Sequence, residues 1–171
     1  MGVIRFQFSR EAGWSSALIA YYGHSWPSHV DVVLASGLLG ARSDSVGEKP
    51  PGVQLRPFHY AAWTHAEVVT LAVADPVAAR FEAVLLRQIG KPYDWRAILA
   101  FAFARDWRQT DSWFCSELAA WACEQSGVFP QPLDERVNKI TPPDLRLVLS
   151  PWVTAVAGEA GPAGKARVIA P

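Results

Sequence analysis

The two kinds of secondary-structure signal occupy different parts of this chain, because strand-like patterns precede Ala74 and helix signals follow Asp75. Alternating apolar and polar side chains predict a strand over residues 3–8, and an apolar run rich in Val and Thr over residues 66–74 is typical of a buried strand. Segregation of this kind favours an α+β architecture over alternating βαβ units.

A hairpin is expected at residues 28–34 and 38–42, around the turn Ala35, Ser36 and Gly37, because glycine can supply the positive φ of a tight turn. A short helix is predicted before it, over residues 14–22. A loop follows at residues 43–52, and a short strand at residues 53–56.

Four further helices are predicted from capping signals. Asp75 is expected to cap the first helix, with Pro76 in its first position, and Gly90 to end it. The other three are expected to begin at Asp94, at Asp111 or Ser112, and at Thr141, and to run to Ala104, Gly127 and Leu149 respectively.

The length of 171 residues, of which 50% are hydrophobic, suits a single domain with a real core. We expect this domain to cover residues 1–154. Residues 155–171 are rich in Ala, Gly and Pro, which predicts an irregular C-terminal arm with an edge strand at residues 167–169.

Charge and hydropathy exclude several kinds of partner. The chain has 16 basic and 16 acidic residues and no Lys/Arg-rich run, so nucleic acid and anionic lipid are not expected to bind. The longest apolar run, residues 97–104, is far shorter than the roughly 20 residues of a membrane-spanning helix.

The location is expected to be the cytoplasm, because no signal peptide is visible at the N-terminus and both cysteines are expected to be free thiols. Cys115 and Cys123 fall on one predicted helix, where eight residues separate their Cα atoms by about 12 Å. A disulfide needs these atoms within about 7 Å.

Signatures of bound groups are absent from the sequence: there is no Gly-rich phosphate loop, no paired His at helical spacing with a Glu between, and no CxxC pair. We therefore expect no cofactor and no metal site.

Cys115 is the candidate nucleophile. It falls in the first turn of its predicted helix, where unpaired backbone N–H groups and the helix dipole favour a negative charge. It also begins a stripe of small side chains that could simply be core: Cys115, Leu118, Ala119, Ala122 and Ser126. Cys123 is assigned to the core.

His29 is the candidate base, because it opens a predicted strand on which its side chain shares a face with Asp31 and Val33. A third polar group usually orients such an imidazole. With the turn at residues 35–37, antiparallel pairing places Ser43 opposite His29 and Asp44 next to it. Asp44 is the favoured partner, since a carboxylate stabilises an imidazolium best. The alternatives are Ser43, Asp31 and Gln54.

Three short segments resemble the circularly permuted papain-like cysteine hydrolases of the YiiX type, which are related to NlpC-type cell-wall peptidases. They read Ser-His-Val-Asp-Val-Val-Leu at residues 28–34, Gly-Lys-Pro-Tyr-Asp-Trp at residues 90–95, and Trp-Phe-Cys-Ser-Glu-Leu at residues 113–118. The order is informative, because the His strand precedes the Cys helix only in the permuted group. Such proteins often carry a Glu on the strand after the His, where this chain has no Glu.

This resemblance implies a permuted papain-like fold, in which the Cys helix belongs to a helical subdomain packed against an antiparallel sheet or small barrel. It implies a thiol hydrolase of amide or ester bonds, with Cys115 as nucleophile and His29 as base. Tyr93 is expected to assist at the oxyanion, and Trp113 and Ser28 to contact substrate. The expected substrate is a peptide, a muropeptide or an acyl lipid.

Two other functions remain open from the sequence. An inactive papain-like binding module could hold a protein partner on a rim of tryptophans, namely Trp26, Trp63, Trp107 and Trp113. A lipid acyltransferase or thioesterase is the other alternative, because permuted relatives include such enzymes.

Overall fold

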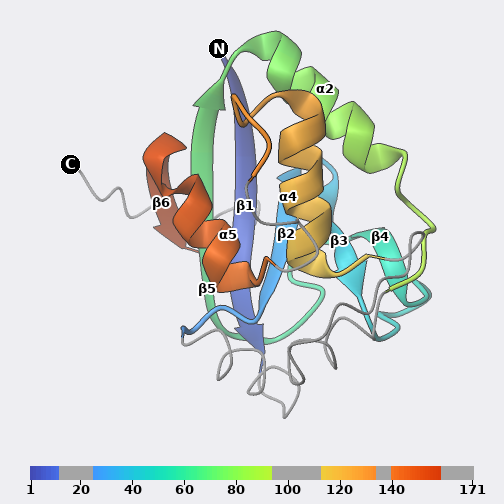
Figure 1. Ribbon diagram of the computed structural model, residues 1–171. Coiled ribbons are helices and arrows are strands. Elements are labelled where there is room, and N and C mark those ends of the chain that lie inside the picture. Colours follow the sequence, from blue (N-terminus) through green and yellow to red (C-terminus); the bar gives the residue numbers. More distant parts are fainter. Residues whose placement is uncertain (12–24, 94–112, 134–139, 159–171) are drawn as a thin grey trace.

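The computed structural model describes residues 1–11, 25–93, 113–133 and 140–158 (Figure 1). Its centre is a six-stranded antiparallel sheet in the order β4-β3-β2-β1-β5-β6. The strands are β1 (Gly2–Glu11), β2 (His29–Leu34), β3 (Gly37–Arg42), β4 (Gly52–Arg56), β5 (Trp63–Val73) and β6 (Val153–Gly158). Together with the helices below, the sheet confirms the expected α+β class.

The hairpin of β2 and β3 is confirmed, but its register differs by one residue from the expectation. Leu34 pairs with Gly37, so the turn contains only Ala35 and Ser36. Gly37 has φ +149°, and a Cβ at this position would meet the carbonyl oxygen of Arg56 at 2.2 Å. Gly37 is therefore needed at the start of β3, where a neighbouring backbone approaches closely.

The helices in the described residues are α2 (Asp75–Leu86), α4 (Cys115–Ser126) and α5 (Pro142–Leu149). The α5 cap is confirmed, since Thr141 Oγ1 accepts a hydrogen bond from the Asp144 backbone N–H. The α4 helix ends, as expected, at Gly127, whose φ is +81°.

Helix starts are predicted less well. Ala74, not Asp75, is the N-cap of α2, and its side chain cannot accept a hydrogen bond. The N-cap of α4 is Phe114, directly before Cys115. The expected caps at Asp111 and Ser112, and the helices expected over residues 14–22 and 94–104, lie outside the described residues.

The predicted C-terminal arm is partly wrong, because the sheet continues past residue 154. Strand β6 runs to Gly158 and pairs with β5 through partners such as Val156 and Val69. The β-branched residues Val153, Thr154 and Val156 favour this strand, which the Ala- and Gly-rich run after it obscures in the sequence. The edge strand expected at residues 167–169 lies outside the described residues.

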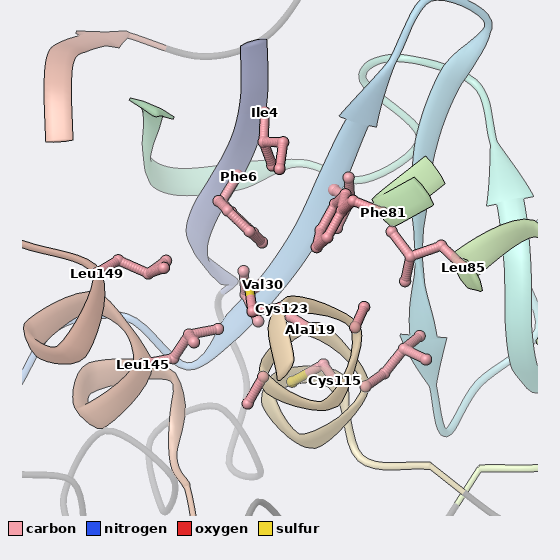
Figure 2. Close-up of a cluster of buried hydrophobic side chains, with 14 of the residues drawn as sticks. Ile4, Phe6, Val30, Phe81, Leu85, Cys115, Ala119, Cys123, Leu145 and Leu149 are labelled. Atoms are coloured by element: carbon pink, nitrogen blue, oxygen red, sulfur yellow. The ribbon is translucent and has the colours of Figure 1, made fainter. Parts of the chain in front are cut away.

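One face of the sheet carries the main core. Figure 1 shows α2, α4 and α5 on this same face. Phe6 and Val30 point from the sheet into the cluster, and Phe81, Ala119 and Leu145 point into it from the three helices (Figure 2). Burial of these apolar side chains fixes α4 against β2 and β3.

The opposite face of the sheet is partly covered by the segment between β4 and β5. Val33, Leu38 and Val68 form a small buried cluster there, against which Phe58 and Tyr60 pack. Because side chains alternate along a strand, His29 and Asp31 share this face with Val33. The segment therefore lies against the face that carries the candidate base.

Candidate active site

His29 and Cys115 are the first residues of their elements, β2 and α4. The helix packs on this strand, and both beginnings lie at the same end of the sheet (Figure 1). A side-chain hydrogen bond joins the two residues and contributes to the raised pKa of His29. Because His29 is the terminal residue of β2, it can contact Asp31 on one face of the sheet and also the start of α4, which covers the opposite face.

Cys115 lies at the position that the sequence predicts, in the N-terminal turn of a helix. It is a free thiol, only 2% exposed. The Glu117 carboxylate accepts from the Phe114 backbone N–H at 3.2 Å, which anchors this turn. The predicted small-residue stripe is also buried, so Cys115 lies at the end of a packed helix face. Cys123 is fully buried, as expected, and burial raises the pKa of its thiol.

The carboxylate beside His29 belongs to Asp31. Its Oδ1 lies 3.0 Å from Nε2 of His29, and the Asp31 side chain is fully buried. Burial lowers the pKa of His29, but the charge of Asp31 and then that of Cys115 outweigh it and raise the value to about 10. Burial also raises the pKa of Asp31, yet His29, Tyr60 and Arg56 together hold it below its usual range. The pair is therefore ionised at neutral pH.

Tyr60 joins this pair from the segment between β4 and β5. Its hydroxyl group donates to Asp31 Oδ2 at 2.7 Å and lies 3.2 Å from His29 Nε2. The ring packs edge-to-face on Trp63, which in turn stacks against the His29 ring. Both aromatic side chains thus hold the imidazole from the side away from α4.

Neighbouring strands leave space for the Asp31 carboxylate and provide a positive charge near it. A Cβ on Gly40 would lie 2.0 Å from Asp31 Oδ1, so only glycine at this position admits the carboxylate. Arg56 is 1% exposed, and its positive charge contributes to the lowered pKa of Asp31. The Arg56 guanidinium is held by carbonyl oxygens of Gly40 and Gly52, at 3.0 and 3.1 Å.

The prediction that Asp44 partners His29 needs correction. Asp44 accepts hydrogen bonds from Arg42, at 2.7 Å from Nε and 2.8 Å from Nη2. The cause is that the turn has two residues and not three. When the observed pairing of β2 with β3 is extended to His29, the residue opposite His29 is Arg42 instead of Ser43. Of the alternatives, Ser43 is exposed, and Gln54 lies on β4, two strands from β2.

Tyr93 lies beside Trp113, which is two residues before the start of α4. They form an isolated parallel β-bridge, and the Trp113 backbone N–H donates to the Pro92 carbonyl oxygen at 3.0 Å. Both side chains are half-buried, and the Tyr93 ring contacts that of Phe114. The structure therefore brings Tyr93, the expected oxyanion donor, and Trp113, an expected substrate contact, next to the start of α4.

The structure argues against the expected substrate contact of Ser28. Ser28 is 5% exposed and its amide and hydroxyl groups donate to the Ser9 carbonyl oxygen, so it lies beneath the surface. The expected tryptophan rim is half-buried where it is described: Trp26 packs on His65, and Trp63 on Tyr60. Trp107 lies outside the described residues.

Sequence reasoning did not find Tyr60, Arg56 or Gly40 as parts of the site. Arg56 closes a short strand and reads as a solvent-facing charge. Tyr60 falls in an aromatic run, Phe-His-Tyr at residues 58–60, inside a segment with no strand or helix period. That run is the one available signal, because aromatic side chains in a turn-like segment often pack back onto the fold.

A scan against protein-family models gives no match to this chain, and a search of curated proteins gives none either. Within the residues that the structure describes, no group of three or more His, Cys, Asp or Glu side chains could hold a metal ion. None of the described helices is long and apolar enough to cross a bilayer.

Proposed function

We propose that this chain is a cysteine hydrolase of amide or ester bonds, with Cys115 as nucleophile, His29 as base and Asp31 as the residue that orients His29. The observation that carries the proposal is the hydrogen bond between Cys115, at the start of α4, and a His29 ring held by Asp31. A thiol that contacts an imidazole, which in turn contacts a carboxylate, provides a nucleophile, its base and an orienting group.

The chemistry follows from these positions. The Cys115 proton resides on His29, which the Asp31 charge favours as the imidazolium, and the sulfur attacks the carbonyl carbon of the substrate. Backbone N–H groups at the start of α4 are candidate donors for the developing oxyanion, with Tyr93 as a candidate second donor. The imidazolium then returns its proton to the leaving amine or alcohol, and water attacks the remaining thioester to release the acid and the thiol.

Topology supports the finer proposal of a permuted papain-like fold. The His strand precedes the Cys helix along the chain, and that helix packs on an antiparallel sheet. Peptides, muropeptides and acyl lipids remain the proposed substrate classes. A reducing location such as the cytoplasm is also proposed, since both thiols are free.

Alkylation tests the activated thiol directly. At pH 6 an ordinary thiol is almost wholly protonated, so limiting iodoacetamide should modify Cys115 first if His29 activates it. Peptide mass spectrometry should show Cys115 modified well before Cys123, and His29→Ala should remove the difference. Equal rates at the two cysteines of the wild-type protein would refute the proposal.

Trapping of the acyl intermediate tests the reaction itself. Incubation with activated esters of amino acids and of fatty acids should add the acyl mass to Cys115, and neutral hydroxylamine should remove it as expected of a thioester. Cys115→Ala should abolish the adduct, while Cys123→Ala should retain it. If Cys115 is reactive toward iodoacetamide but no ester acylates it, the result favours the alternative of an inactive binding module with a papain-like fold.

A further inference from the structure

The hydroxyl group of Tyr60 has one proton to donate and two lone pairs, and all three have partners. It donates to Asp31 Oδ2 at 2.7 Å, while Arg42 Nη1 donates to its oxygen at 3.4 Å. The remaining partner is His29 Nε2, at 3.2 Å. Because the only hydroxyl proton is directed at Asp31, Nε2 must carry the proton in its contact with Tyr60.

This proton count determines which nitrogen of the His29 ring faces which partner. Nε2 lies 3.0 Å from Asp31 Oδ1, as an ion pair, and 3.2 Å from the Tyr60 oxygen, to which it donates. The other ring nitrogen, Nδ1, is then the atom available for the hydrogen bond with Cys115. With Nε2 facing Asp31 and Tyr60, Nδ1 is the ring nitrogen that exchanges the proton with Cys115.

The position of Tyr60 is itself firmly determined. Its ring packs against two guanidinium groups, those of Arg42 and Arg56, at 5.2 and 5.7 Å from the ring centroid. The preceding residue, His59, is the one non-glycine residue with positive φ in the described ranges, at +58°. A backbone conformation this rare in L-residues persists only where surrounding contacts hold it.

We propose that Tyr60 is a positioning residue, whose hydroxyl group holds His29 Nε2–H together with Asp31 and thereby directs Nδ1 at Cys115. This inference rests on the proposed function for its consequence, but not for its geometry. Tyr60 does not touch the reacting atoms, and it acts through Asp31 and His29.

The first test is nuclear magnetic resonance of the wild-type protein at pH 7. The Nε2–H proton of His29 should be far downfield, protected from exchange, and close enough to the Tyr60 hydroxyl proton for a nuclear Overhauser effect. His29→Ala identifies the signal. An Nε2–H that exchanges as fast as that of the exposed His65 would overturn the proposal without any assay of activity.

The second test is Tyr60→Phe, which removes the hydroxyl group and retains the ring. Loss of a hydrogen bond to a charged group should slow Cys115 alkylation at pH 7 by about tenfold. Thr64→Val is the matched control, because its hydroxyl group donates only to the Arg10 carbonyl oxygen at 2.9 Å, and it should alkylate at the wild-type rate.

A double variant separates positioning from general loosening of the fold. In an Asp31→Asn background, Tyr60→Phe should slow alkylation by less than about twofold, because both residues act through the same ring. Equal losses in both backgrounds would reject the positioning role. If wild-type Cys115 is no more reactive than Cys123, the proposed function fails while the Nε2–H measurement still decides this inference.

Discussion

Asp31 lies with its carboxylate oxygen 3.0 Å from Nε2 of His29, two residues earlier on the same strand. Side chains two apart on a strand point to the same face, so β2 supplies both members of the pair. The geometry between His29 and Asp31 therefore depends on one strand. Neighbouring strands contribute space and charge, and the segment between β4 and β5 contributes the Tyr60 contact.

The two aspartates near His29 should differ sharply in effect. Asp31→Asn removes the carboxylate next to Nε2 and should slow alkylation of Cys115 at pH 7 by about tenfold or more. Asp44→Asn is the matched control, since this half-exposed carboxylate is bound to Arg42, and it should change the rate by less than about threefold. A larger effect from Asp44→Asn would restore Asp44 as the partner of His29.

Gly40→Ala should displace the Asp31 carboxylate. The added Cβ would stand 2.0 Å from Asp31 Oδ1, so the carboxylate must move. We expect a loss of about 1–3 kcal/mol in the free energy of unfolding, together with slower alkylation of Cys115. Gly158→Ala has nothing within 4 Å of its Cβ, and should leave both urea unfolding and alkylation unchanged.

The stability of the protein should depend on pH through His29. Its folded pKa of about 10 exceeds the ordinary value of 6.5, so the folded state binds the proton more tightly. The resulting stabilisation is fully present below about pH 6.5 and is lost as pH rises toward about 10. Urea unfolding should therefore show that His29→Gln destabilises the protein less at pH 10 than at pH 6. A constant difference would contradict the raised pKa.

Arg56 should be required for stability although it is charged. Arg56→Met would leave the carbonyl oxygens of Gly40 and Gly52 without this donor in a buried region, and Asp31 without a neighbouring cation. We expect about 3 kcal/mol less free energy of unfolding, measured in urea. Arg87→Met, at an exposed side chain that donates to Ala83, should cost less than about 0.5 kcal/mol. Similar losses in both variants would argue against a special role of Arg56.

Local patterns predicted those parts of the site that depend on one element. The helical pattern after residue 112 predicted that Cys115 lies in the first turn of its helix, although the observed N-cap is Phe114, and strand alternation predicted the shared face of His29 and Asp31. The choice of Asp44 over Asp31 failed because it needed the exact number of turn residues. A difference of one residue in the turn exchanges the faces of every later side chain on the strand.

Contacts between distant segments were beyond prediction from a single sequence. Strand β6 pairs with the edge of β5, and its few β-branched residues lie beside an Ala- and Gly-rich run that hides the strand signal. Tyr60 reaches the site through a segment without periodicity, held by a positive φ at His59. In each case the tertiary partner, and not the local pattern, selects the conformation.

The separation of His29 from Cys115 along the chain also has a consequence for biosynthesis. During translation β1, β2 and β3 emerge before α4, so the base and its carboxylate can be in place while the thiol is still in the ribosome. Cys115 meets them only when α4 docks on β2 and β3. On the proposed function, a newly made chain would therefore carry a thiol without its His29 partner until α4 has docked.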